Sequence, residues 1–170
     1  MALLEVLHFP DERLRKKALS VDKIDSNIKE IANDMLETMY AEGGIGLAAT
    51  QVNIQKRIVV IDLSEEKNSP LILINPEIVK CEGTETMREG CLSVPDFFDT
   101  VERAEFIKFN YQNLEGDTIT QETGGLLAVC VQHEIDHLDG KLFIDYLSPL
   151  KQLRLKKKIN KLEKIQQKVL

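Results

Sequence analysis

The sequence predicts a single α+β domain over residues 1–170, with antiparallel or mixed sheets packed around a central helix and further helices near the N-terminal and C-terminal ends. A chain of 170 residues is typical of one domain and buries enough surface to form a core without stabilising cross-links. Its 43% hydrophobic and 29% charged residues are ordinary for a globular protein. The expected helices and strands do not alternate as regular β-α-β units, which favours α+β over a doubly wound α/β fold.

Three segments have the apolar spacing of helices. Apolar residues recur at helical intervals over Ile28–Met39, with Ser26 or Asn27 as the expected N-cap and Gly43-Gly44 as the expected stop. The other two expected helices are Leu126–Leu138, which lies between Gly124-Gly125 and Gly140, and the terminal helix Leu153–Val169.

Short β-branched segments, separated by Asn, Gly and Pro signals, predict strands. The clearest is Arg57–Leu63, whose RIVVIDL run is short and rich in β-branched residues. The composition of Asn113–Asp117 indicates a turn. The remaining expected strands are Leu71–Ile74, Glu77–Cys81, Phe106–Tyr111, Thr118–Thr120 and, briefly, Leu142–Tyr146.

Several features of the composition narrow the setting in which the protein works. No apolar run approaches the ~20 residues needed to cross a bilayer. Met1–Pro10 has neither the basic start nor the apolar core of a signal peptide. Three cysteines, an odd number, argue against a disulfide framework and for a reducing compartment. We therefore expect a cytoplasmic protein with no membrane partner.

The charge is divided unequally along the chain. Residues 151–170 carry eight Lys or Arg and one acidic residue, a net charge of +7, so the total of −6 leaves −13 for residues 1–150. An acidic body is poorly suited to general nucleic-acid binding, whereas the basic end suits an anionic partner. The glycine-rich segment Gly43–Gly46 follows a helix rather than a strand and lacks dinucleotide-binding spacing, and no Walker A pattern occurs.

The strongest chemical signal is the motif His133-Glu134-Ile135-Asp136-His137. In a helix, two histidines four residues apart lie one turn apart on the same face, so both imidazoles can reach one metal ion. A glutamate beside the first histidine can hold a water bound to that ion. Two of the chain's three histidines fall in the motif, which makes an incidental pair of solvated histidines the weaker interpretation. The central helix is therefore expected to be a metal-binding helix.

A catalytic metal site needs a third protein ligand and an open position for water. His8 lies near the start of the chain and is one alternative, whereas Glu163 has little chain left to build around it. Cys130 stands seven residues before His137, about 10.5 Å away along the helix axis, so we expect it to line the site as a small hydrophobe. Cys91 is better placed, because its Gly- and Pro-flanked loop or strand end can deliver a thiol; an inert buried cysteine is the alternative.

Three segments stand out when they are read together: Gly44–Gln51 (GIGLAATQ), Glu89–Ser93 (EGCLS) and His133–Gly140 (HEIDHLDG). In their order and approximate spacing they resemble the peptide deformylase family. The resemblance covers nearly the whole chain, from Pro10-Asp11 to Leu147–Lys151. It implies an enzyme that removes the formyl group from the N-terminal methionine of newly synthesised proteins and releases formate.

The resemblance also implies roles for individual residues. The implied metal ligands are Cys91, His133 and His137. The implied metal is one divalent ion, usually Fe²⁺ in the family, which Zn²⁺, Ni²⁺ or Co²⁺ can replace. Glu134 acts as general base and then general acid while a metal-activated water attacks the formyl carbon. The Gln51 amide and the backbone N–H of Leu92 donate hydrogen bonds to the developing oxyanion.

The implied substrate is an N-formyl-methionyl nascent peptide. The segment that contains Gly44 and Gly46 is expected to pair with the peptide backbone, although turn-forming glycines are the alternative interpretation. The residues expected to line the pocket for the methionine side chain are Ile45, Met87, Leu126, Val129 and Cys130. Ordinary core packing is the alternative for these residues, and the two interpretations are compatible because a pocket wall is also core.

The chain departs from the family pattern at two places. Thr50 stands where the family usually has proline before the glutamine, which allows the backbone more freedom and adds a hydroxyl. Phe97-Phe98 occupies a stretch where many bacterial members carry an arginine that contacts the substrate backbone or the rim of the site. We therefore expect this chain to accept more apolar residues after methionine.

The basic segment 151–170 has two interpretations. One is a solvated amphipathic helix, and the other is a contact with ribosomal RNA, as some bacterial family members make through a C-terminal helix. Two rival functions also stay open: another H-E-x-x-H metallohydrolase, and a catalytically silent relative that binds formyl peptides. The resemblance places the protein in a bacterial cytoplasm.

Overall fold

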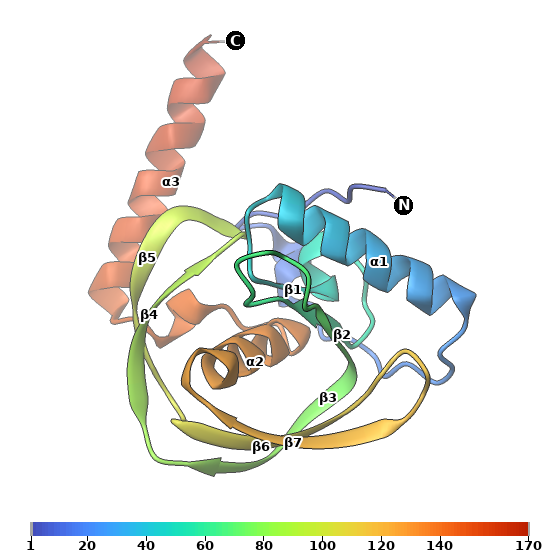
Figure 1. Cartoon of the computed structure of the whole chain (residues 1–170). Coiled ribbons are helices and arrows are strands. Elements are labelled where there is room, and N and C mark those ends of the chain that lie inside the picture. The colour runs from blue at the N-terminus through green and yellow to red at the C-terminus, as the bar shows by residue number, and fades with distance from the viewer. Residues whose placement is uncertain (1, 170) are drawn as a thin grey trace.

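The computed structural model describes residues 2–169, with side chains through residue 165, and its polypeptide folds around one central helix (Figure 1). The helices are α1 (Ser26–Ala41), α2 (Gly125–Leu138) and α3 (Pro149–Val169). The strands are β1 (Gly46–Ala48), β2 (Ile58–Ile61), β3 (Leu71–Glu82), β4 (Glu85–Cys91), β5 (Val94–Arg103), β6 (Phe106–Gln112) and β7 (Thr118–Gly124). Short 3-10 helices span Glu12–Arg15, Ala49–Val52 and Phe143–Tyr146.

The strands form two separate antiparallel units. Five of them make a sheet in the order β1-β2-β3-β6-β7, and β4 pairs with β5 in a two-stranded ribbon. Figure 1 shows α2 at the centre, with the sheet curving beneath it and the ribbon beside it. The predicted α+β class, with antiparallel sheets around a central helix, is confirmed.

Strand β2 is buried on both faces, which explains its unbroken apolar sequence. Val59 and Ile61 belong to the apolar cluster that packs against α2, whereas Ile58 and Val60 belong to the cluster that packs against α1. Successive side chains of a strand point to opposite faces, so a strand between two layers needs apolar residues at every position. The predicted strand at Arg57–Leu63 is confirmed, with shorter bounds.

The sequence locates the central helix almost to the residue. Strand β7 runs to Gly124, and α2 begins directly at Gly125, whose φ of +63° is a left-handed conformation that favours glycine. The chain leaves α2 through Gly140, whose φ is +80°. These two glycines let the chain turn sharply before and after the helix, so the apolar run between them is held across the sheet.

The predicted N-cap of α1 is wrong by one or two residues. Asp25, not Ser26 or Asn27, caps the helix: its Oδ1 accepts a hydrogen bond from the N–H of Ile28 at 3.0 Å. Aspartate at this position satisfies one of the free N–H groups of the first turn.

Some strands differ from the predicted ones. The two strands predicted at Leu71–Ile74 and Glu77–Cys81 are one strand, β3, because the chain passes Asn75 (φ +51°) with a shift of register instead of a loop. Strands β4 and β5 were not predicted beyond a loop or strand end around Cys91, because their many polar residues show no apolar alternation. Pro95 lies where the β4–β5 register slips, as expected of a residue without an N–H to donate.

The strand predicted at Leu142–Tyr146 is wrong. This segment is a 3-10 helix, in which Asp145 accepts a hydrogen bond from the N–H of Leu142 at 3.0 Å and donates its own N–H to the Leu142 carbonyl at 3.0 Å. Aspartate competes with a strand ladder by bonding nearby backbone groups in this way. The apolar residues of the segment are still buried, Phe143 and Ile144 among them, so the composition signalled burial rather than strand.

Helix α3 begins at Pro149, earlier than the predicted start at Leu153, and projects away from the body (Figure 1). Its first turns pack against the ribbon through Leu155, which is buried, whereas Leu162 and Ile165 further along are about half exposed. None of the helices in residues 2–169 combines the length and apolar character that a membrane crossing requires.

Candidate metal centre

Helix α2 directs His133 and His137 to one point. Their Nε2 atoms lie 3.2 Å apart, one helical turn separating the two residues. The side chain of His137 is 1% exposed and that of His133 is 11% exposed. The spacing of four residues therefore brings the two imidazoles together, as the sequence predicts.

Cys91 joins this pair from the other side of the site. It is the last residue of β4, where the ribbon turns back through Leu92 and Ser93 and Cys91 pairs with Val94. Its Sγ lies 3.2 Å from the Nε2 of His137. The Sγ atom and one nitrogen of each histidine all lie within 4.8 Å of one another.

These three residues fit a divalent metal ion. Imidazole nitrogens about 2.0–2.1 Å and a thiolate about 2.3 Å from one tetrahedral ion stand roughly 3.3–3.6 Å apart. The two separations of 3.2 Å between the donor atoms are close to these values. One thiolate and two imidazoles suit ions such as Fe²⁺, Zn²⁺, Co²⁺ or Ni²⁺, and three protein ligands leave a position for water or substrate.

Cys130 and His8, the other candidates for a third metal ligand, lie outside this cluster. Cys130 packs in the apolar core between α2 and the sheet. Burial is the main cause that raises the pKa of its thiol to about 12, so it stays protonated. His8 is exposed. The thiol of Cys91 is thus the one that meets the histidine pair.

Glu134 lies beside the centre without being one of its converging donors. Its Oε1 is 3.8 Å from the Nε2 of His133 and 4.0 Å from that of His137, and the residue is 2% exposed. Burial raises its pKa to about 7, although the nearby charges of His133 and Arg103 counteract the rise. A carboxyl group with a pKa in this range can both take up and release a proton near neutral pH.

Gln51 lies against the sulfur of Cys91. Its side chain is held at both ends: Oε1 accepts the N–H of Ala48 at 2.9 Å, and Nε2 donates to Ser93 Oγ at 3.0 Å. The same Nε2 is 3.5 Å from Cys91 Sγ, which also accepts a hydrogen bond from the N–H of Ser93 at 3.4 Å. The amide is therefore fixed beside the centre before a substrate arrives.

The start of β1 passes close to the centre. A Cβ added to Gly46 would lie 2.8 Å from Oε2 of Glu134, and one added to Gly44 would lie 2.7 Å from the side chain of Leu92. A larger residue at either position would therefore push the Leu92 or Glu134 side chain out of place. The segment is thus pressed against two of the residues expected in the chemistry.

Sequence analysis did not identify the residues that orient His133. Its Nδ1 lies 2.8 Å from Oε1 of Glu89, which leaves Nε2 directed at the centre. Arg103 donates two hydrogen bonds to the carboxylate of Glu89, from Nε at 2.8 Å and from Nη2 at 2.9 Å. The side chain of Glu89 is 5% exposed and that of Arg103 is 4% exposed. Glu89 stood in a recognised motif, but nothing in the sequence marked Arg103.

Arg103 also returns to the metal-binding helix. Its third hydrogen bond, 2.7 Å long, is to Oδ2 of Asp136, which also accepts the hydroxyl of Tyr146 at 2.7 Å. The guanidinium lies 4.9 Å from the centroid of the Tyr146 ring. Burial by itself would lower the pKa of Arg103, but Glu89 and Asp136 outweigh it, so the pKa is raised and the charge is secure.

Thr50 ties the Gln51 segment to the metal-binding helix. It is fully buried, and its hydroxyl donates to the backbone carbonyl of His137 at 2.9 Å. The threonine at this position therefore adds a direct bond between two parts of the centre. The Nδ1 of His137 itself is buried and has no hydrogen-bond partner among the described residues.

The residues expected to line a methionine pocket differ in exposure. Val129 and Cys130 are buried, Met87 is partly buried, and Ile45 and Leu126 are 45% and 48% exposed. Val129 and Cys130 lie on α2 within one turn of His133, as the spacing implies.

The two phenylalanines that depart from the family pattern point in different directions. Phe97 is partly buried, and its ring centroid is 6.1 Å from that of Phe143, which in turn stacks 5.9 Å from His133. Phe98 is 56% exposed, lies opposite Gly90 across the ribbon, and has the Arg88 guanidinium 5.3 Å from its ring centroid. Phe98 thus lies across the ribbon from the residue that precedes Cys91.

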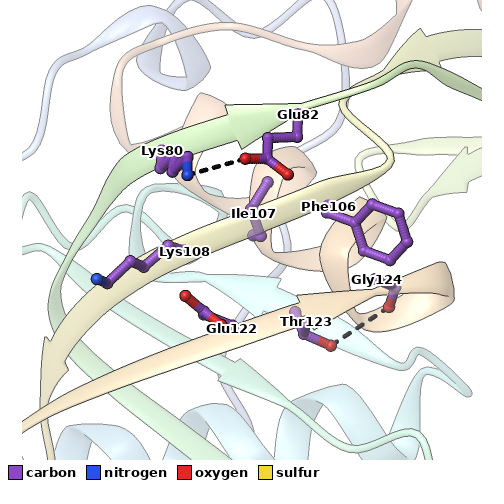
Figure 2. Close-up of a pocket in the computed structure, with 8 residues that line it drawn as sticks. All are labelled: Lys80, Glu82, Phe106, Ile107, Lys108, Glu122, Thr123 and Gly124. Atoms are coloured by element: carbon purple, nitrogen blue, oxygen red, sulfur yellow. Dashed lines mark hydrogen bonds and ion pairs between the residues drawn. The ribbon is translucent and has the colours of Figure 1, made fainter.

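A separate groove of about 660 Å³ lies on the sheet away from this centre (Figure 2). Its lining comes from β3, β6 and β7, and Figure 2 shows the Phe106 ring beside Gly124 and the Lys80–Glu82 ion pair along its rim. None of the expected catalytic or substrate-binding residues lines this groove.

Comparison with known proteins gives a consistent result. The family described as polypeptide deformylase matches residues 3–153. Peptide deformylase of Pseudoalteromonas translucida is 59% identical over 95% of this chain and 96% of its own length, and that of Nitrosococcus oceani is 56% identical over 97% and 99%. Among solved structures, the Legionella pneumophila peptide deformylase has a TM-score of 0.91 at 44% identity, covering 96% of this chain and 97% of its own.

A complex of Ehrlichia chaffeensis peptide deformylase with actinonin has the same TM-score of 0.91, at 40% identity, and covers 96% of this chain and 99% of its own. The family match, the identities and the shared fold all extend over nearly the whole chain, including the metal centre. The chain therefore belongs to the peptide deformylase family, and it is a hydrolase that removes the formyl group from N-terminal methionine.

Proposed function

We propose that deformylation takes place at the centre described above, with Cys91, His133 and His137 holding one divalent metal ion, Fe²⁺ in the cell. The observation that carries this proposal is the convergence of Cys91 Sγ and two imidazole nitrogens within 4.8 Å, with a buried carboxylate beside them. When bound, the metal supplies a water of lowered pKa and polarises the formyl carbonyl.

Glu134 moves the proton in this proposal. Its Oε1, 3.8–4.0 Å from the two Nε2 atoms, is placed to accept a proton from the attacking water as the water oxygen bonds to the formyl carbon. The same carboxyl group then returns that proton to the amine nitrogen as the C–N bond breaks and formate leaves. No other carboxylate among the described residues lies as close to both histidine Nε2 atoms.

Gln51 and Leu92 stabilise the carbonyl oxygen as it gains negative charge. Gln51 is suited to this role because its Oε1 is anchored to Ala48, which turns Nε2 toward Cys91. Leu92 comes directly after Cys91 in the chain, so its backbone N–H lies beside the proposed metal ligand. Donors fixed before the reaction need no reorganisation, and the loss of one costs about 2.7–4 kcal/mol of transition-state stabilisation.

The formylated peptide is proposed to lie along the free edge of β1. Among the described strands β1 pairs only with β2, and the segment Gly44–Gly46 that leads into β1 is pressed against Leu92 and Glu134. An extended peptide can add to such an edge through main-chain hydrogen bonds. The methionine side chain would then enter an apolar site that the following residues line: Ile45, Met87, Leu126, Val129 and Cys130.

Two further proposals concern the substrate and its source. The exposed ring of Phe98 lies across the ribbon from Gly90, the residue before Cys91, and it favours apolar side chains at the second or third peptide position. A series of formylated peptides that differ only at these positions tests this, and equal kcat/KM for alanine and leucine there would contradict it.

Helix α3 is proposed to contact ribosomal RNA in a bacterial cytoplasm. Seven Lys or Arg residues lie between 151 and 164 on a helix that projects from an acidic body. Such a contact weakens steeply with salt. Cosedimentation with ribosomes at two salt concentrations, with a chain truncated after Pro149 as control, tests it; unchanged binding by the truncated chain would refute the proposal.

Formate release tests the chemistry. Protein purified without oxygen is loaded with Fe²⁺ or, separately, with Zn²⁺ and given formyl-Met-Ala-Ser. We expect release with Fe²⁺, none from Glu134→Ala with its metal intact, and loss of metal from Cys91→Ala. Metal retained by Cys91→Ala would favour a different H-E-x-x-H hydrolase, and no release from fully metallated protein would favour a silent binding protein. Equal rates with both ions would remove the argument for Fe²⁺.

A further inference from the structure

Asp62 is a buried carboxylate that the reaction does not use. It follows directly on β2, is 4% exposed, and is not among the residues proposed to hold the metal or to move the proton. Its Oδ1 accepts the N–H and the hydroxyl of Ser64, at 2.9 and 2.6 Å, and its Oδ2 accepts the N–H of Ser69 at 3.2 Å. These bonds fix the carboxylate to the connection between β2 and β3.

The same residue also holds the last turn of α1. The hydroxyl of Tyr40 donates to Oδ2 of Asp62 at 2.5 Å. The helix ends at Ala41, and Gly43, two residues later, has a φ of +71°. The N–H of Gly43 bonds to Tyr40 O at 3.1 Å and the N–H of Gly44 to Met39 O at 2.9 Å. This pair of bonds is a Schellman motif. Because Gly44 is bonded directly to the last turn of α1, the position of that turn fixes the position of Gly44.

The backbone of Asp62 holds the far end of the same segment. Its N–H donates to the carbonyl of Ile45 at 2.9 Å, one residue before β1 begins. Asp62 therefore holds both ends of residues 41–45. Its side chain holds the first end through Tyr40, and its backbone N–H holds the second through Ile45. Between these two points lies Gly44, against Leu92, and immediately after them Gly46, against Glu134.

We propose that Asp62 is a positioning residue for substrate binding, because it holds residues 41–45 against the metal centre through Tyr40 and Ile45. The proposal rests on the proposed pairing of the formylated peptide with this edge. A loop held at both ends keeps its N–H and C=O groups in place, so the peptide does not have to order them when it binds. Asp62 acts on the Michaelis complex and not on the metal ion or the proton transfer.

Tyr40→Phe is the mildest test, because it removes one hydroxyl and keeps the ring that packs against the core. Its matched control is Ser64→Ala, which also removes one hydroxyl from the same carboxylate, but from the side that does not lead to α1. Asp62→Asn is the second variant; it keeps the shape of the side chain and removes its charge.

Two readouts are measured on metal-loaded protein: KM and kcat for formyl-Met-Ala-Ser, and amide hydrogen exchange at Gly44, whose N–H bonds to the carbonyl of Met39. Tyr40→Phe and Asp62→Asn should raise KM about fivefold to tenfold with kcat changed less than twofold, because only part of the free energy of a hydrogen bond to a charged group is lost from the Michaelis complex. Exchange at Gly44 should be roughly tenfold faster. Ser64→Ala should leave both quantities within about twofold of the wild type, and metal content should stay the same in all variants.

Four results would overturn the inference, the last two of them for the same reason. Unchanged exchange in Tyr40→Phe would show that Asp62 does not hold the segment. Faster exchange with an unchanged KM would refute the proposed pairing of substrate with this edge, and the role in binding with it. A fall in kcat together with lost metal, or equal effects of Ser64→Ala and Tyr40→Phe, would show that Asp62 acts on general stability instead.

Discussion

Arg103 allows a demanding test of how the metal centre is held together. Its side chain is 4% exposed and makes three charged hydrogen bonds, two to Glu89 and one to Asp136, all between 2.7 and 2.9 Å. Glu89 in turn holds Nδ1 of His133. Replacing Arg103 by leucine removes all three bonds and leaves the carboxylate of Glu89 buried with no cation except the imidazole.

The expected loss of stability follows from this burial. Removing one partner of a buried pair costs about 3–5 kcal/mol, because the remaining charge is left uncompensated. An exposed pair offers the contrast: Arg13 bonds Asp11 at 2.7 Å, but its side chain is 46% exposed. Arg13→Leu should therefore cost much less stability than Arg103→Leu. The metal affinity of Arg103→Leu should fall roughly tenfold to a hundredfold, since the orientation of His133 is loosened.

The pH dependence of the effect has a definite sign. Burial by itself would raise the pKa of Glu89, but Arg103 and His133 outweigh it, and the pKa is lowered. A carboxylate with a lowered native pKa adds stability above its unfolded pKa, about 4.3 for glutamate, and loses it as the pH falls through the native value. The stability difference between wild type and Arg103→Leu should therefore be full at pH 7 and shrink below about pH 4.

Urea denaturation of metal-loaded protein at pH 7 measures the free energy of unfolding for the wild type, Arg103→Leu and Arg13→Leu. Competition with a chelator measures the metal affinity of the same three proteins. A loss below about 1 kcal/mol in Arg103→Leu, or a loss no larger than that of Arg13→Leu, would refute the view that this buried network supports the centre.

Other parts of the structure give three further predictions. Gly46→Ala places a Cβ 2.8 Å from Oε2 of Glu134, so the carboxylate must shift and formate release should fall roughly tenfold to a hundredfold; an unchanged rate with intact metal would contradict this. Thr50→Val removes the hydroxyl that bonds the carbonyl of His137, so urea denaturation should show a loss of about 1–2 kcal/mol, and a loss under 0.5 would count against that bond. Burial alone would raise the pKa of Asp62, but hydrogen bonds lower it to about 2, so it stabilises the fold above about pH 4 and this contribution is lost as the pH falls toward 2. The stability of Asp62→Asn, measured by urea denaturation of metal-free protein at pH 6 and pH 3, should accordingly fall less between these pH values than that of the wild type.

The features that the sequence predicted well depend on residues close together in the chain. His133 and His137 meet at one point because helical spacing alone puts residues four apart on one face. The helix that carries them was predicted because its apolar run lies between glycines. Strand β2 was recognised for a similar reason: a short run buried on both faces must be apolar throughout.

The features that were missed depend on partners distant in the chain. Strands β4 and β5 pair mainly with each other, so their polar sequence carries no alternation to recognise. The segment Leu142–Tyr146 is apolar because it is buried, but the hydrogen bonds of Asp145 decide its backbone shape. The cap of α1 shows a smaller case, in which three neighbouring polar residues were all suitable and only Asp25 has the right backbone position.

The sequence by itself determined the family, and it predicted the helix that carries the histidine pair and the residues expected at the centre, because these are carried by short motifs whose spacing is local. Only the tertiary structure decided how those residues are held. Arg103 reaches Glu89 and Asp136 across 14 and 33 residues, and Asp62 reaches back 22 residues to Tyr40. Hydrogen bonds between distant segments leave no periodic trace in a sequence, since each depends on where folding brings two single side chains together.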